Sequence, residues 1–72
     1  MSRRREVAIG QRYQPTQSNA VWEILELVRD AAGIQHARLI RIGDPTAIKM
    51  ISASALKDVR LYRLLTDGES AA

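Results

Sequence analysis

The chain has no cysteine and no phenylalanine, and only three of its 72 residues are aromatic. Without cysteine, disulfide scaffolds, thiolate zinc sites and thiol catalysis are excluded. No apolar run approaches the roughly 20 residues of a membrane span, and no apolar stretch follows the first arginines as a signal peptide requires. We therefore expect a cytoplasmic protein that does not enter the membrane.

The excess of positive charge is confined to one end. Lysine and arginine number 11 against 8 acidic residues, and Arg3, Arg4 and Arg5 account for the whole net charge of +3. From Glu6 onward the chain is neutral. A high isoelectric point is therefore weak evidence for a nucleic-acid-binding surface on the body of the protein.

The length allows one domain. We expect a flexible basic tail over residues 1–6, a single small domain over 7–65 and a flexible C-terminal tail over 66–72. A domain of this size, without disulfides, must be stabilised by its core or by a partner.

Turn-forming residues recur at short intervals and separate short apolar runs. The turn clusters are Gln14–Asn19, Asp30–Gly33, Gly43–Thr46, Ser52–Ser54 and Asp67–Gly68. The runs between them predict strands at Val7–Tyr13, Ile34–Ile42, Ala47–Ser52 and Val59–Leu65, with a single helical turn at Ser54–Asp58. This rhythm is typical of a small up-and-down β domain.

The segment Ala20–Asp30 fits two structures. Its apolar residues follow helical spacing, with Ser18 or Asn19 as a cap and Gly33 at the end. As a strand its alternation is imperfect, because Glu26 falls on the apolar face of Trp22 and Ile24. The hairpin-like loop that follows favours the strand. We expect an all-β fold, a small five-stranded barrel with one short helical turn before the last strand; the alternative is α+β with a helix at about 20–30.

A pattern over nearly the whole chain resembles a group of short bacterial proteins that have no established activity. The shared residues are Gly10-Gln11-Arg12-Tyr13, Val21-Trp22-Glu23-Ile24, Gly33–Leu39, Asp44-Pro45-Thr46, Lys49–Ser52, Ala55-Leu56, Asp58 and Tyr62. A Gly-x-x-Tyr strand, a strand centred on tryptophan and a helical turn before the last strand are also similar to SH3-like barrels. The resemblance implies this fold and brings no activity with it.

No set of residues predicts catalysis or a cofactor. His36 is the only histidine, and we interpret it as a strand residue that is exposed or hydrogen-bonded, since one histidine builds no metal site alone. Glu23 and Glu26 would share a face of a helix but lie on opposite faces of a regular strand, and in either case we expect a solvated surface. We expect no enzyme, no metal and no cofactor.

The sequence therefore favours a small non-enzymatic binding module that docks a protein partner. We place its contact surface at Arg12, Tyr13 and Trp22, because aromatic residues near loops often bind ligands in such barrels.

The alternative is weak nucleic-acid binding. In that case Arg3, Arg4 and Arg5, with Arg38 and Lys49, would neutralise phosphates while Trp22 or Tyr13 stacks on bases. Edge strands in so small a sheet also make self-association an expectation to test.

Overall fold

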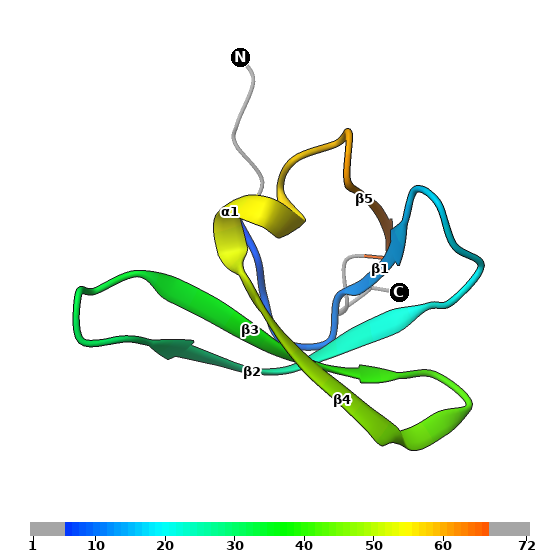
Figure 1. Ribbon diagram of the computed structural model, residues 1–72, viewed down its shortest axis with the longest axis horizontal. Coiled ribbons are helices and arrows are strands. Elements are labelled where there is room, and N and C mark those ends of the chain that lie inside the picture. The colour runs from blue at the N-terminus through cyan, green and yellow to red at the C-terminus, as the bar shows by residue number, and fades with distance from the viewer. Residues whose placement is uncertain (1–5, 67–72) are drawn as a thin grey trace.

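The computed structural model describes residues 6–66, which form five antiparallel strands and one short helix. The elements are β1 (Arg12–Pro15), β2 (Trp22–Arg29), β3 (Gln35–Arg41), β4 (Asp44–Ser52), α1 (Ala53–Leu56) and β5 (Tyr62–Thr66). The strand order in the sheet is β4-β3-β2-β1-β5. Within the described residues β4 and β5 pair on one side only, so the sheet is open, and α1 links its two edges (Figure 1). The all-β prediction is confirmed at this level.

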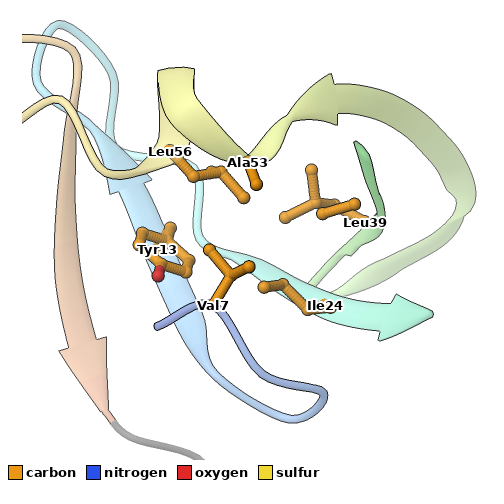
Figure 2. Packing of buried hydrophobic residues seen from close by; sticks show 7 residues of the cluster. Val7, Tyr13, Ile24, Leu39, Ala53 and Leu56 are labelled. Carbon is orange, nitrogen blue, oxygen red and sulfur yellow. The ribbon is translucent and has the colours of Figure 1, made fainter. Parts of the chain in front are cut away.

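The core lies on the concave face of the curled sheet, beneath α1. Its fully or nearly buried apolar residues are Val7, Tyr13, Ile24, Ala37, Leu39, Ala53 and Leu56 (Figure 2). Ile24 and Leu39 are cross-strand partners on β2 and β3, so their side chains share one face of the sheet. Leu56 and Ala53 cover them from α1, and Val7 reaches the same cluster from the segment before β1.

The strand β2 carries a one-residue bulge at Leu25. Ile24 pairs with Leu39 and Glu26 pairs with Arg38, which leaves Leu25 without a partner on β3. A bulge inserts one extra residue, so the alternation of side chains shifts by one position beyond it. Glu23 and Glu26 consequently lie on the same convex face, and the prediction that a strand would separate them is wrong. Leu27 joins Ile24 on the concave side for the same reason.

The alternative of a helix at about 20–30 is wrong, because residues 22–29 form β2. Helical spacing over this segment arises from the bulge, which interrupts the period of two. The strand pairs with β3 along its length and with β1 at Trp22 and Glu23. These non-local hydrogen bonds and the shared core outweigh a local propensity of only a few tenths of a kcal/mol per residue.

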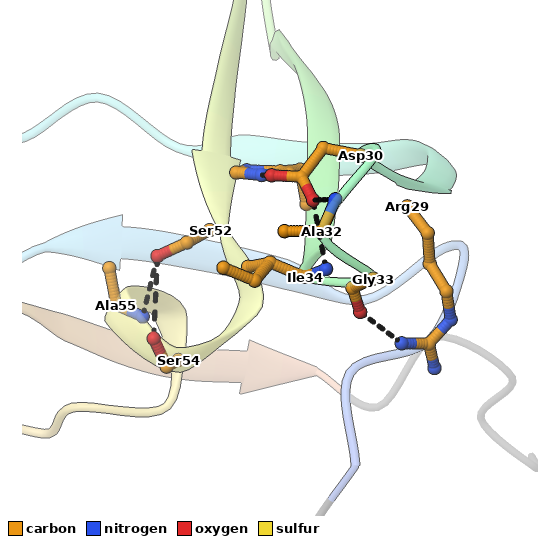
Figure 3. A network of polar contacts seen from close by, with 9 residues as sticks. Arg29, Asp30, Ala32, Gly33, Ile34, Ser52, Ser54 and Ala55 are labelled. Carbon is orange, nitrogen blue, oxygen red and sulfur yellow. Dashed lines mark hydrogen bonds and ion pairs between the residues drawn. The ribbon is translucent and has the colours of Figure 1, made fainter.

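The hairpin between β2 and β3 lies where the sequence predicts it. The carboxylate of Asp30 accepts hydrogen bonds from the backbone N–H groups of Ala32 and Ile34, at 2.9 and 3.0 Å (Figure 3). Gly33 adopts a positive φ of 83°, which favours glycine, and its carbonyl accepts from the Arg29 guanidinium at 2.8 Å.

Several boundaries differ from the predicted ones. β1 begins at Arg12 rather than Val7, since residues 9 and 10 form a turn and Gly10 has a φ of 91°. Gln14 and Pro15, predicted as loop, complete β1 opposite β5. β4 starts at Asp44, and the helical turn begins one residue early, at Ala53. The tails predicted at 1–6 and 66–72 lie outside the described residues except for Glu6 and Thr66.

The placement of β2 against the core predicts a sharp difference between two neighbouring residues. Ile24 has 0% of its surface exposed, whereas Leu25 is 42% exposed. We expect Ile24→Ala to lower the free energy of unfolding by about 2–5 kcal/mol, because it leaves a cavity in the core. Leu25→Ala should cost about 1 kcal/mol or less. Urea unfolding followed by Trp22 fluorescence measures both, and equal losses would contradict the placement of Ile24 in the core and of Leu25 on the outer face.

Candidate functional site

A groove opens where the β1–β2 connection, α1 and the start of β5 meet. It has a volume of about 460 Å³. Its lining residues are Pro15, Thr16, Gln17, Ile51, Ala55, Arg60, Leu61 and Tyr62, and we call this surface the α1–β5 groove. The lining is mainly apolar, with two hydroxyls, one amide and one guanidinium, and its residues include no carboxylate. Such a mixture suits a chain of alternating apolar and polar groups.

The wall that leads into β5 is shaped by Asp58. The backbone carbonyl of Asp58 accepts hydrogen bonds from the N–H groups of Leu61 and Tyr62, at 2.9 and 3.0 Å. Its carboxylate accepts from the backbone N–H of Arg60 at 2.9 Å, and from the Arg60 guanidinium at 2.9 and 3.1 Å. The hydrogen bonds from the Arg60 guanidinium, and then the one from its backbone N–H, lower the pKa of Asp58 to about 2. This turn directs Leu61 and Tyr62 toward the groove.

A second, adjoining wall comes from the β1–β2 connection, which is hydrogen-bonded to the first wall. The N–H of Thr16 donates to the carbonyl of Leu61, and its hydroxyl donates to the carbonyl of Arg60, both at 3.0 Å. Pro15 lies opposite Tyr62 in the register of β1 and β5. Backbone pairing thus holds the first residues of this connection against the start of β5.

The third wall is set by the cap of α1. The hydroxyl of Ser52 accepts a hydrogen bond from the N–H of Ala55 at 3.2 Å, as an N-cap residue does (Figure 3). The chain thus turns sharply at the end of β4. Ile51, the last concave-facing residue of β4, and Ala55 line the same side of the groove.

Beside the groove, an ammonium lies between two aromatic rings. The Nζ atom of Lys49 is 4.1 Å from the ring centroid of Trp22 and 5.7 Å from that of Tyr62. Both distances allow cation–π attraction. Lys49 pairs with Leu39 in the register of β4 and β3, so its stem lies along the concave face. Partial burial lowers the pKa of Lys49 and raises the pKa of Tyr62.

The predicted contact residues do not share one surface. Tyr13 is 3% exposed, and its hydroxyl donates to the side-chain oxygen of Gln11 at 2.9 Å, so its ring belongs to the core. Arg12 lies on the convex face, where it pairs with Glu23 at 3.0 Å. Trp22 alone reaches the neighbourhood of the groove, through Lys49.

The residues proposed for phosphate contact are also separated. Arg38 lies on the convex face and pairs with Glu26 at 3.5 Å, whereas Lys49 lies on the concave face. Arg3, Arg4 and Arg5 lie outside the described residues. The structure therefore assembles no common cationic surface from Arg38 and Lys49.

His36 is hydrogen-bonded, one of the two states expected for it. Its Nε2 lies 3.1 Å from the Asp30 carboxylate at the β2–β3 hairpin. The backbone hydrogen bond from Ile34, followed by the contact with His36, lowers the pKa of Asp30. Among residues 6–66, no three His, Asp or Glu side chains are grouped as a metal site needs.

Sequence reasoning missed most of the groove. Thr16, Gln17, Arg60 and Leu61 have no motif in common, and the hydrogen bonds of Thr16 to Arg60 and Leu61 join the two loops. The one usable signal was Asp58-x-Arg60, a spacing in which an acid can accept from both the backbone and the side chain two residues later.

No protein-family model, curated protein or solved structure matches this chain. Among the described residues, no helix has the length and hydropathy needed to cross a bilayer.

The turn that shapes the groove can be tested by titration. We expect the Asp58 carboxyl to titrate near 2 and to shift up toward its ordinary value of 3.8 in Arg60→Gln. Because folding lowers this pKa, the pair stabilises the fold above pH 3.8, and that contribution is lost as the pH falls through about 2. Carboxyl-detected NMR gives both midpoints. Lys57→Gln, a matched loss of charge nearby, should leave Asp58 unchanged; an equal shift there would contradict the specific contact.

Proposed function

We propose that this chain is a small non-enzymatic binding module with the architecture of an SH3-like barrel, and that it docks an extended segment of a partner protein in the α1–β5 groove. The open apolar groove between two loops is the observation that carries the proposal. The antiparallel order β4-β3-β2-β1-β5, with a helical turn between β4 and β5, supports the barrel-like architecture.

The groove favours an extended chain over a helix or a compact ligand. It is bounded by the β1–β2 connection on one side and by α1 and Ile51 on the other. Pro15, Leu61 and Tyr62 offer apolar contacts. At the exposed rim, the Gln17 amide can hydrogen-bond a peptide backbone, and the Thr16 hydroxyl, which donates to Arg60, can accept a hydrogen bond. Extended segments are bound in this way, with side chains in apolar pockets and main-chain hydrogen bonds at the rim.

Charge complementarity favours a segment that is acidic as well as apolar. Arg60 lines the groove and Lys49 lies beside it, next to Tyr62. Arg60 is paired with the Asp58 carboxylate, whereas Lys49 has no carboxylate partner among residues 6–66. An acidic partner segment would meet attractive potential on approach, and this increases the rate of association.

Nucleic-acid binding is the competing outcome. Arg12 and Arg38, on the convex face, are each paired with a glutamate. In this alternative the phosphate contacts come chiefly from Arg3, Arg4 and Arg5. Binding through phosphates falls steeply between about 50 and 200 mM salt, whereas an apolar groove responds much less.

Selection of binders from a library of short random peptides tests the proposal, with the consensus peptide then synthesised. Leu61 is 49% exposed in the groove, and Val59 is 82% exposed outside it, two residues earlier in the same loop. We expect Leu61→Ser to lower the affinity for the peptide by about tenfold, because burying a leucine contributes about 1.5–3 kcal/mol to binding. Val59→Ser should have little effect.

Calorimetry or Trp22 fluorescence gives the affinities, and the amide spectrum of each variant checks the fold. Equal weakening by both substitutions would contradict the groove as the docking surface. Failure to select any peptide, with tight salt-sensitive binding of short DNA or RNA, would favour the nucleic-acid alternative.

A further inference from the structure

Lys49 differs from the other cations of the described chain in what surrounds it. Arg12, Arg38 and Arg60 each pair with a carboxylate. Arg29 and Arg63 donate to oxygens of Gly33 and Gln14, and Arg41 and Lys57 are exposed to solvent. The Lys49 ammonium is half-buried on the concave face beside the rings of Trp22 and Tyr62, and among residues 6–66 it has no hydrogen-bond or ion-pair partner.

Ring faces attract a cation but do not satisfy its hydrogen-bond donors. An ammonium has three N–H donors, and an aromatic face supplies no lone pair of the strength of a carboxylate oxygen. The rings hold the amine in place, and its stem is already ordered along Leu39. A carboxylate that arrives there forms a charge-assisted hydrogen bond without first ordering the lysine.

We propose that the Lys49 ammonium receives a carboxylate of the segment bound in the α1–β5 groove. This inference rests on the proposed function. Tyr62 joins the two places, since its ring faces Lys49 and also lines the groove. The Lys49 site thus gives the partner segment a chemical identity: an apolar side chain in the groove and an anionic group beside Tyr62.

The strand geometry fixes the spacing of these two groups. Lys49 and Ile51 lie on the same face of β4, two positions apart, and Ile51 lines the groove. Two positions of extended chain span about 6.5–7 Å. In an extended partner, side chains two positions apart also share a face. The carboxylate should therefore follow or precede the buried apolar residue by two positions.

This carboxylate has two sources, an acidic side chain or the C-terminus of the partner. Three N-acetylated tripeptides separate them: leucyl-alanyl-glutamate amide, leucyl-alanyl-alanine with a free C-terminal carboxylate, and leucyl-alanyl-glutamine amide as the neutral reference. Each is titrated at low salt while the side-chain signals of Trp22 and Tyr62 and the amide signals of Ala55 and Leu61 are followed by NMR.

We expect at least one carboxylate peptide to bind about tenfold more tightly than the glutamine amide, as hydrogen bonds to charged groups do. The tighter of the two identifies the source. Lys49→Met keeps the apolar stem and should abolish this preference, while Lys49→Arg should retain part of it. Lys57 is the only other lysine of the chain, and Lys57→Met should leave the preference intact.

The outcomes separate the inference from the proposed function. If all three peptides shift Ala55 and Leu61 with equal affinity, the groove binds peptide and the role of Lys49 is overturned. A preference that survives Lys49→Met overturns it as well, as does absence of binding by all three. If carboxylate peptides shift Trp22 in a Lys49-dependent way but Leu61→Ser has no effect, the Lys49 site stands and the groove fails.

Discussion

The pairing of β2 with two neighbours at once is the constraint on which the rest of the structure depends. Trp22 and Glu23 have partners on both β1 and β3, whereas the strand beyond the Leu25 bulge pairs with β3 alone. A bulge bends its strand and increases the local twist. β1 and β5 are thereby carried over the concave face, where Tyr13 and Ile24 meet the helix residue Leu56. Without that bend, one face of a flat sheet would leave the apolar residues exposed.

The open side of this curled sheet is where the groove lies. β4 and β5 are the two edge strands, and the region between them is covered by α1, the Asp58 turn and Lys49 rather than by strand pairing. Lys49 is a charged residue on the inward face of an edge strand, a placement that discourages edge-to-edge aggregation. The same lysine contacts rings from β2 and β5. One side chain therefore both protects the edge and supplies a cation beside the groove.

The sequence predicted the number and approximate place of the strands because their limits are set locally. Asp30 and Gly33 make a turn by their own chemistry, and Ser52 and Ser54 mark the change from strand to helical turn, where the Ser52 hydroxyl caps α1. The faces of the strands could not be predicted in the same way. Alternation predicts that Lys49 and Met50 point to opposite faces of the strand. Only the curl of the sheet decides that the lysine faces the core and the methionine faces out. The Leu25 bulge and the burial of Tyr13 likewise depend on partners distant in the chain, and so does the groove.

Whether a partner segment lies along the α1–β5 groove can be measured by intermolecular nuclear Overhauser effects on the protein in complex with a synthetic peptide chosen for its affinity. We expect contacts from the peptide to Ala55, Leu61 and the Tyr62 ring. Contacts confined to Arg38, Met50 and the rest of the convex face would contradict it.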